Sequence, residues 1–498
     1  MNAALLASVF VIATAGLVYE LLAGTIASYL LGDSVTQFST VIGAYLFSMG
    51  VGSYLAKFLK RGLVAYFIQV EILVAVVGGC SATVLFLSFE QVNSFRIVLY
   101  GTVGLVGMLV GMEIPLLLRI MEGKLQFSEL ISRVLSIDYL GALAASILFP
   151  LWLVPELGLM QSAFLFGLLN AVVALLTCLL FWQEVPAVRW LVVEAAVVAL
   201  GLASGLAFSR ELTGLAESQM YSDSVLYART TPYQRIVLTR SRNELRLYLN
   251  GHLQFSSLDE YRYHEALVHP GLASVARPER VLVLGGGDGM AVREVLRDPR
   301  VKEIKLVDLD HGMTELFTTH ELLVPLNERA FLSPKVTVEN HDAFVWLRET
   351  PGLYDFVVVD FPDPSSYSLG KLYTTAFYRE LVEHLAPGGA IVVQSTSPLF
   401  ARKAFWCVQE TLAAVGLKTV PYHAYVPAFG EWGFVLASRE DYVPPQVLPP
   451  GLRFLSLENL PALFSFPPDM GPVPVEINRL NNQALVQYYD GEWKRVER

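Results

Sequence analysis

The chain has 498 residues, of which only 16% are charged, and its mean hydropathy of +0.48 is far too apolar for an ordinary soluble enzyme. Its formal net charge of −10 argues against a nucleic-acid partner, because a phosphate backbone requires a basic surface. The three cysteines, Cys80, Cys178 and Cys407, match neither a disulfide framework nor a metal-ligand spacing. The apolar excess must therefore be concentrated in one part of the chain.

Residues 1–208 are nearly continuous hydrophobic sequence. We count about seven runs that are long enough to span a bilayer, at residues 4–31, 36–57, 63–88, 95–118, 135–154, 159–182 and 187–208. The first run is too long, and too closely followed by others, for a cleaved signal peptide. Small residues recur within the runs and allow close helix packing. We predict an N-terminal all-α, multi-pass membrane bundle.

Several polar residues lie deep within these runs, namely Glu20, Gln69, Glu71, Glu113 and Glu194. A carboxylate inside a bilayer is costly and often functional. A simple packed bundle is the favoured interpretation, and a pathway for ions or polyamines is the alternative.

Basic residues mark the even connections between the runs, at Lys57, Lys60, Arg61, Arg119, Lys124, Arg133 and Arg189. The odd connections hold only Arg96. The positive-inside rule therefore places the even connections in the cytoplasm. Seven spans would then deliver the C-terminal half to the outside.

The rest of the chain divides into three predicted parts: a junction with a small β-strand domain (209–270), an α/β domain (271–443), and a Pro-rich segment with a C-terminal tail (444–498). Two β-type runs before the turn signal at Asn250 and Gly251 predict a small β-hairpin domain. From Arg280 onward, strands and helices alternate, which predicts a Rossmann-like parallel sheet of the methyltransferase type. We expect the tail to pack or to form a dimer contact.

The first strand of this α/β domain breaks into a glycine-rich turn that includes Gly285, Gly287 and Asp288, and the second strand ends at Asp308. Glycines let the backbone approach a ligand at the carboxyl end of a strand. An acidic residue about 20 positions later can bind the ribose hydroxyls. The pattern predicts a nucleoside pocket.

Carboxylates at successive strand ends indicate the charge of the ligand. Asp342 follows the third strand, where it could accept a hydrogen bond from an adenine amino group. Together with Asp288 and Asp308 it would repel a phosphate, so a dinucleotide is disfavoured. A sulfonium is favoured by the same negative charge.

Asp360 and Asp363 follow a wholly apolar strand and flank a turn that contains proline. Capping the next helix would need only one carboxylate. Two carboxylates that face the pocket can hold a cationic amine and take a proton from it, which makes the amine a nucleophile. We therefore predict that both aspartates are catalytic.

Over roughly residues 221–437 the chain resembles the spermidine synthase family of polyamine aminopropyltransferases, and in particular the bacterial members with an N-terminal membrane domain. The matching stretches are residues 233–234, 263–265, 285–289, 293–296, 308–310, 342, 360–364, 372–374, 377–378 and 387–389. The resemblance implies transfer of an aminopropyl group from decarboxylated S-adenosylmethionine to a diamine such as putrescine, which gives spermidine and methylthioadenosine. It implies no permanently bound cofactor and no metal.

The resemblance also implies residue roles. The nucleoside sulfonium would bind at Gln234, Gly285, Gly287, Asp288, Asp308, Asp342 and Ala343. The amine would bind at Tyr263, His264, Asp288, Asp360, Asp363 and Trp432. Asp360 becomes the proton acceptor, and Asp363 becomes its amine-holding partner. Trp432 falls where the family closes its amine channel.

The chain departs from the family pattern at three places. Phe361 and Pro362 replace a small polar pair, a loop proline is replaced around Tyr367, and Asp308 stands where the common form has Glu. These changes leave the identity of the acceptor amine open.

Two other functions are consistent with the residues: a methyltransferase that uses intact S-adenosylmethionine, and a membrane transporter or sensor of polyamines. Asp288 disfavours the methyltransferase, because it would repel the methionine carboxylate. The metabolite chemistry conflicts with an external C-terminal half, so one apolar segment would be re-entrant, interfacial or miscounted. We predict a homo-oligomer, at least a dimer, in the bacterial inner membrane, with its catalytic domain in the cytoplasm.

Overall fold

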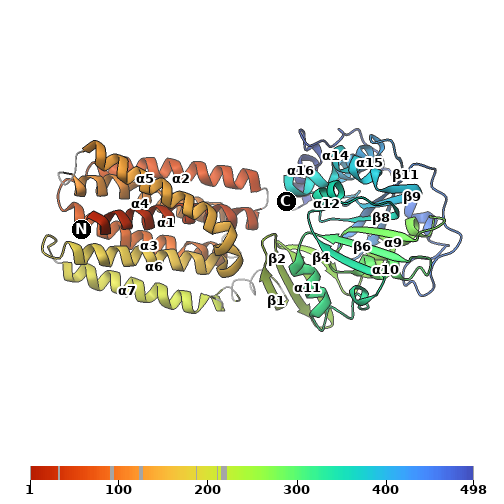
Figure 1. The fold of residues 1–498 in the computed structure, drawn as a ribbon, viewed down its shortest axis with the longest axis horizontal. Helices are drawn as coiled ribbons and strands as arrows, with labels where there is room; N and C mark the ends of the chain where they lie inside the picture. Colours follow the sequence, from red (N-terminus) through yellow and green to blue (C-terminus); the bar gives the residue numbers. More distant parts are fainter. Residues whose placement is uncertain are drawn as a thin grey trace. The chain divides into compact units, whose positions relative to one another are not determined.

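The computed structural model describes residues 2–496 except 32–33, 90–94, 123–126, 187, 210, 213, 215–220 and 222. Lys124 and much of the predicted junction lie outside the described residues. The chain forms two compact units, Met1–Thr239 and Arg240–Arg498. Figure 1 shows the helical bundle of the first unit and the sheet of the second.

The first unit is built mainly of long apolar helices. They are α1 (Asn2–Leu31), α2 (Ser34–Ala56), α3 (Leu63–Phe89), α4 (Phe95–Met121), α5 (Phe127–Leu148), α6 (Gly158–Leu180) and α7 (Val188–Ala207). Within the described ranges, six helical segments are long and apolar enough to cross a membrane. The predicted all-α bundle is confirmed.

The count is six rather than about seven because two predicted spans form one continuous segment, Ser128–Leu180. This segment has 53 residues and would measure about 80 Å if straight, whereas a bilayer core is about 30 Å thick. The π-helix η1 (Phe149–Leu157) separates α5 from α6. Both α5 and α6 pack against α1, so the chain changes direction between them (Figure 1).

A buried polar cluster lies among these helices. The Tyr19 hydroxyl donates to Asn170 Oδ1 (3.3 Å), and Asn170 Nδ2 donates to Glu71 Oε2 (3.0 Å). Within the described part of the chain, one carboxylate oxygen of Glu71 and one of Glu113 are buried without a hydrogen-bond partner. Glu113 and Asp138 line a cavity of about 10 Å³, which is room for one water molecule but not for a polyamine. An ion or polyamine pathway stays a prediction.

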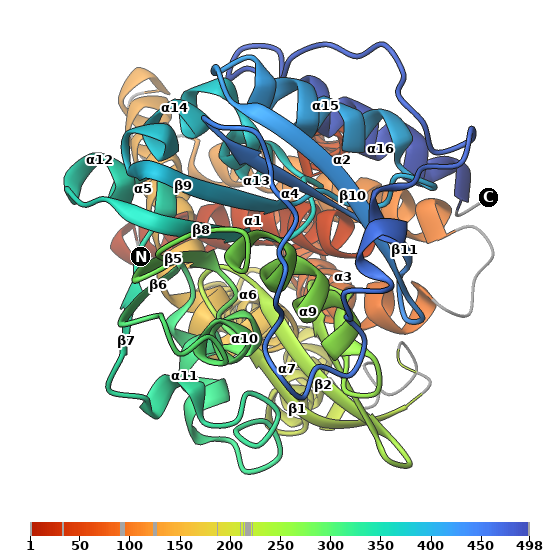
Figure 2. The same cartoon turned by 90° about the vertical axis from the view of Figure 1, so that its right-hand side faces the viewer.

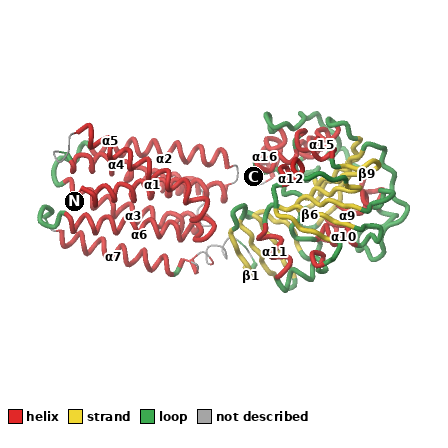
Figure 3. The backbone as a smooth tube through the Cα atoms, in the orientation of Figure 1, coloured by secondary structure: helices red, strands yellow, loops and turns green. Residues whose placement is uncertain are grey.

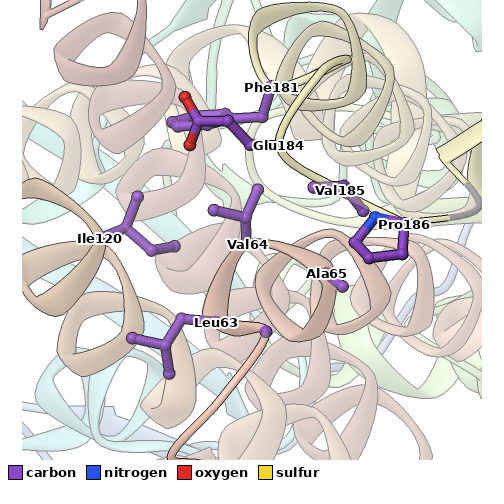
Figure 4. A pocket seen from close by; sticks show the side chains of 9 residues that line it. Leu63, Val64, Ala65, Ile120, Phe181, Glu184, Val185 and Pro186 are labelled. Atoms are coloured by element: carbon purple, nitrogen blue, oxygen red, sulfur yellow. The ribbon is translucent and has the colours of Figure 1, made fainter.

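A larger cavity, of about 300 Å³, lies at the ends of α3, α4 and α6. Figure 4 shows Leu63, Ile120, Phe181, Glu184 and Pro186 around it. Its walls are mainly apolar, and Glu184 is the one carboxylate among its lining residues. It has none of the paired carboxylates of the site described below.

A four-stranded sheet follows the bundle in the sequence, with its strands in chain order: β1 (Ser224–Thr230), β2 (Arg235–Ser241), β3 (Glu244–Leu249) and β4 (His252–Ser256). β3 pairs antiparallel with β4. The predicted small β domain is confirmed.

The second sheet has seven strands in the order β10-β11-β9-β8-β5-β6-β7. Its parallel strands are β5 (Arg280–Gly285), β6 (Glu303–Asp308), β7 (Val336–Asn340), β8 (Tyr354–Asp360) and β9 (Leu385–Gln394). The prediction of a wholly parallel sheet needs one correction: β11 (Gly430–Ser438) runs antiparallel to β9, and β10 (Lys418–Val426) runs antiparallel to β11. Pro421 in β10 lacks an N–H group and is tolerated because this strand lies at the edge.

Helices cover both faces of this sheet (Figures 2 and 3). Alternate residues of β5 enter opposite cores: Leu282 and Leu284 join one, and Val281 and Val283 join the other. The first core includes residues of α12 (Ala343–Glu349), α14 (Thr375–Glu383), α15 (Arg402–Ala413) and α16 (Ala484–Val496). The second includes residues of α9 (Glu260–Leu272), α10 (Met290–Leu296) and η4 (Leu460–Phe464). The remaining elements are α11 (His311–Thr319), α13 (Tyr367–Gly370), η2 (Ala330–Leu332) and η3 (Lys371–Tyr373).

Candidate active site

The turn after β5 requires glycine at two positions for different reasons. Gly285 has a φ of +79°, and a Cβ atom there would lie 2.2 Å from the Asp360 carbonyl oxygen. A Cβ atom on Gly287 would lie 2.8 Å from the Asp308 carboxylate. Because neither glycine carries a side chain, the ends of β5, β6 and β8 can lie close together at one edge of the sheet.

Asp308, at the end of β6, is held against this turn. Its Oδ2 accepts the N–H of Gly287 (3.0 Å), and its Oδ1 accepts the N–H of Asp310 (2.8 Å). Burial, together with the charges of Asp310 and Asp288, raises the pKa of Asp308 to about 7, although the two backbone donors oppose the shift. The carboxylate stands at the strand end where the sequence predicts ribose binding.

Asp288 lies in the turn itself, two residues before the start of α10. Its Oδ1 accepts the N–H of Met290 (2.9 Å), and its carbonyl oxygen accepts from Asn327 Nδ2 (3.0 Å). Its negative charge acts on both Asp308 and Asp360. The three carboxyl groups therefore share one electrostatic environment that favours a cation.

Asp342 has two structural partners in addition to its predicted adenine contact. Its Oδ1 caps α12 by accepting the N–H groups of Phe344 (2.8 Å) and Val345 (3.3 Å). Its Oδ2 accepts from Lys371 Nζ (2.7 Å). Burial opposes ionisation, yet these partners outweigh it and lower the pKa of Asp342. Ala343 is the first residue of α12, and the predicted nucleoside roles of both residues stay predictions.

Asp360 ends β8 and faces the glycine turn. Its carbonyl oxygen accepts the N–H of Gly286 (3.2 Å), and a Cβ atom on Gly286 would lie 3.2 Å from Asp360 Oδ2. Oδ1 accepts the hydroxyl of Tyr263 (2.6 Å). Burial raises the pKa of Asp360 to about 6, with a further increase from Asp288, while the His264 cation and the Tyr263 hydrogen bond oppose the increase. The group is therefore mainly ionised at neutral pH.

His264, on α9, supplies the opposite charge. Its Nδ1 lies 2.8 Å from Glu260 Oε2, and Arg293 binds the same carboxylate through two nitrogens (3.0 and 2.9 Å). Burial disfavours the imidazolium, but Glu260, Asp288 and Asp360 outweigh that effect and raise the pKa of His264 to about 9. His264 is thus a fixed cation beside Asp360.

Asp363 is held by three neutral donors. Gln394 Nε2 donates to its Oδ1 (3.2 Å), while Thr396 Oγ1 (3.3 Å) and the Tyr489 hydroxyl (3.0 Å) donate to its Oδ2. Burial raises the pKa of Asp363 to about 6 against the effect of these donors. No ion pair involves Asp363 among the residues that the structure describes, so its ionised form is well suited to bind an ammonium group.

Gln394 connects Asp363 to Trp432 and to the turn. Its Oε1 accepts from Trp432 Nε1 (3.2 Å) and from the N–H of Thr396 (3.0 Å), and its Nε2 donates to the Phe361 carbonyl oxygen (2.7 Å). Trp432 therefore belongs to the same hydrogen-bond network as Asp363. Its ring also contacts Phe429, with centroids 5.1 Å apart.

Phe361 and Pro362, which replace the small polar pair of the family pattern, are held by local contacts. The Phe361 ring is buried and packs edge-on against Tyr373 and Phe377. The carbonyl oxygens of both residues accept from the Tyr373 hydroxyl, at 3.3 and 3.1 Å. Backbone acceptors and an apolar contact thus fix the turn between the two aspartates without a polar side-chain pair.

The structure groups most of the predicted residues at one edge of the sheet but leaves Gln234 in the other compact unit. Gln234 lies between β1 and β2, where its carbonyl oxygen accepts the N–H of Thr231 (2.9 Å). Its nucleoside role stays a prediction. The sequence analysis did not single out Thr396 or Tyr489, whereas Gln394 is the last residue of β9 and belongs to the polar residues expected at the carboxyl ends of the strands.

Comparisons with known proteins show the family to which the chain belongs. Residues 260–447 match the model of the spermine/spermidine synthase domain. A polyamine aminopropyltransferase of Leptospira interrogans is 53% identical over 496 residues, and the match covers all of both chains. The chain belongs to the polyamine aminopropyltransferase family.

Other members of this family are also similar over nearly their full length. The Oceanobacillus iheyensis enzyme is 40% identical, with 97% of this chain and 96% of that chain covered. A Mycobacterium tuberculosis enzyme is 38% identical, with 99% and 97% covered. A spermidine synthase solved with the transition-state analogue AdoDATO is 24% identical, covers 49% of this chain and 85% of its own, and has a TM-score of 0.46. Family membership favours the aminopropyltransferase prediction over the methyltransferase and transporter alternatives.

Proposed function

We propose that the enzyme transfers the aminopropyl group of decarboxylated S-adenosylmethionine to a diamine such as putrescine. The observation that supports this most directly is the position of Asp360, whose Oδ2 lies against the glycine turn at Gly286. A base at this place is next to the predicted nucleoside pocket. The pKa of about 6 leaves Asp360 able to accept a proton at neutral pH.

In the proposed reaction, Asp363 binds the amine as an ammonium and Asp360 accepts its proton. The freed nitrogen attacks the aminopropyl carbon bound to sulfur, a C–N bond forms, and the C–S bond breaks with its electron pair moving to sulfur. The products are neutral methylthioadenosine and spermidine. Negative charge stabilises the sulfonium before displacement, and positioning of the two reactants supplies much of the rate.

The proposed roles of the other residues rest on their charge, their hydrogen bonds and their position in the site. Asp288 would exclude intact S-adenosylmethionine, because its carboxylate would repel the methionine carboxylate. Asp308 would accept hydrogen bonds from ribose, and Trp432 would close the amine channel beside Gln394. Tyr263 holds Asp360 in place through its hydroxyl.

Asp360→Asn tests the assignment of the base. The amide cannot accept the amine proton, so methylthioadenosine formation should fall by at least about 10²-fold, while the nucleoside still binds. Mass spectrometry of products with a panel of diamines, and calorimetry with decarboxylated S-adenosylmethionine, would measure the two effects. Asp441→Asn, an exposed surface change, is the matched control. Wild-type turnover in Asp360→Asn would refute the role.

We further propose that the apolar segments anchor the enzyme in the bacterial inner membrane with the catalytic part in the cytoplasm, where its substrates are made. An even count of six apolar segments, with basic residues in the second and fourth connections between them, supports this location. Self-association as a homodimer or larger oligomer also stays a prediction, which mass photometry of the purified protein would test.

A further inference from the structure

The C-terminal helix α16 reaches the predicted amine end of the site. The family match ends at residue 447, well before this helix begins. Even so, the Tyr489 hydroxyl donates to Asp363 Oδ2 at 3.0 Å, across 126 residues of sequence. A residue outside the matched domain is therefore in direct contact with a predicted amine-binding carboxylate.

Other contacts hold α16 in place. Leu485 is fully buried, and the Trp493 ring packs against Phe400, with ring centroids 5.8 Å apart. The Glu492 carboxylate accepts the N–H groups of Lys403 (3.1 and 2.9 Å) and Ala404 (3.2 Å), at the start of α15. The helix thus docks without needing the Tyr489 hydroxyl.

The segment before α16 is anchored close to the same site. Asn478 Nδ2 donates to the carbonyl oxygens of Gly370 and Tyr373, both at 3.1 Å, and its Oδ1 accepts the N–H of Leu485 (3.3 Å). Tyr373 in turn donates to the turn between the two aspartates. The tail and the loop that follows Asp363 therefore form one packed structure.

We propose that α16 forms part of the acceptor-amine subsite, with Tyr489 as a positioning residue for Asp363; this inference rests on the proposed function. Gln394 fixes one carboxylate oxygen of Asp363, and Tyr489 with Thr396 fixes the other. The plane of the carboxylate is set by these three donors, and its ionised form is stabilised without a competing cation. The ligand of this subsite is the primary ammonium of a diamine.

Tyr489→Phe removes the hydroxyl but keeps the ring that packs against Trp493. A hydrogen bond to a charged group contributes about 1.5–3 kcal/mol. Because the variant loses the bond that orients Asp363 for the amine, we expect KM for the diamine to increase about tenfold. kcat and KM for decarboxylated S-adenosylmethionine should change less than about twofold. Loss of a donor to the carboxylate raises the pKa of Asp363, so the acid limb of kcat/KM should move to higher pH.

Tyr488→Phe is the matched control, because Tyr488 is next in sequence but its hydroxyl accepts the N–H of Glu476 (3.2 Å) instead. A wild-type diamine KM and pH profile in Tyr489→Phe, or equal changes in both variants, would overturn the proposal. Calorimetric titration of putrescine into the full-length enzyme gives a second readout that does not need turnover. A wild-type enzyme that binds putrescine but forms no product would refute the proposed function, and weaker putrescine binding in Tyr489→Phe would still support the subsite.

Discussion

His264 and Asp360 carry opposite charges in one buried environment, and each changes the proton affinity of the other. The imidazolium lowers the pKa of Asp360, and Asp360 helps to raise that of His264. At neutral pH the pair is a cation beside an anion. This balance keeps Asp360 mainly ionised at neutral pH in spite of its burial, as its proposed role as a base requires.

His264→Gln should raise the pKa of Asp360 above its value of about 6, because the opposing cation is lost. Asp360 must be ionised to accept a proton, so the acid limb of kcat/KM should move upward by about one pH unit. The measurement is kcat/KM against pH between 5 and 9. His252→Gln, an exposed change in β4, provides the comparison. An acid limb that coincides with wild type would show that His264 does not tune Asp360.

At the residue scale, the sequence predicts the carboxylates better than their partners. Asp308 and Asp360 end their strands and Asp342 lies just after β7, and the carboxyl ends of parallel strands meet at one edge. The contact between Asp363 and Tyr489 could not be predicted, because it joins a turn to a tail helix 126 residues away. In the sequence, Tyr489 is one of three aromatic residues on an amphipathic helix, and nothing distinguishes it from the other two.

At the scale of elements, the turn between β5 and α10 depends on a glycine backbone, and so does the pairing of β5 with β8. Gly285 has a left-handed φ of +79°, and its backbone lies against that of Asp360 in the neighbouring strand. Any side chain at this position would separate β5 from β8. The glycine turn is therefore required for the pairing of the two strands as well as for the predicted nucleoside pocket.

Gly285→Ala should destabilise the enzyme by about 2–4 kcal/mol, through an unfavourable φ and a Cβ contact 2.2 Å from backbone oxygen. A lower melting temperature together with lost turnover is the expected result. Gly352→Ala is the control, because its Cβ would meet only ordinary contacts, the nearest at 3.4 Å. Equal melting temperatures in the two variants would contradict the steric account.

Elements with regular periodicity were predictable, and those that depend on distant packing were not. Alternating strands and helices predict the five parallel strands, each with its own helical partner. Edge strand β10 was missed because its Pro421 interrupts a strand pattern. The π-helix η1 lies in a mainly apolar run, where Pro150, Pro155 and Gly158 mark an irregularity but do not predict the π-type hydrogen bonding.

For the whole molecule, the number of membrane crossings determines the side on which the catalytic unit lies. An even number leaves both termini on one side, and an odd number separates them. The segment Ser128–Leu180 decides between the two, because it contains two helices joined without a loop. The basic connections and the substrates favour cytoplasmic placement of the catalytic unit.

A green fluorescent protein fused after Arg498 should therefore fluoresce in bacterial cells, because this reporter folds in the cytoplasm. Alkaline phosphatase fused at the same point should be inactive. A second pair of fusions at the N-terminus would show whether the number of membrane crossings is even or odd. Active phosphatase at the C-terminus would place the catalytic unit outside and refute the orientation.

The joined helices α5 and α6 also have a consequence for biogenesis. The residues between them, Phe149–Leu157, form a π-helix and include a single charged side chain, Glu156. No polar loop separates the two helices, so no hydrophilic connection is available to remain in water while the second helix is synthesised. Lipid accepts backbone only when its hydrogen bonds are satisfied internally. For the proposed membrane location, we therefore expect α5 and α6 to insert together as one continuous apolar unit.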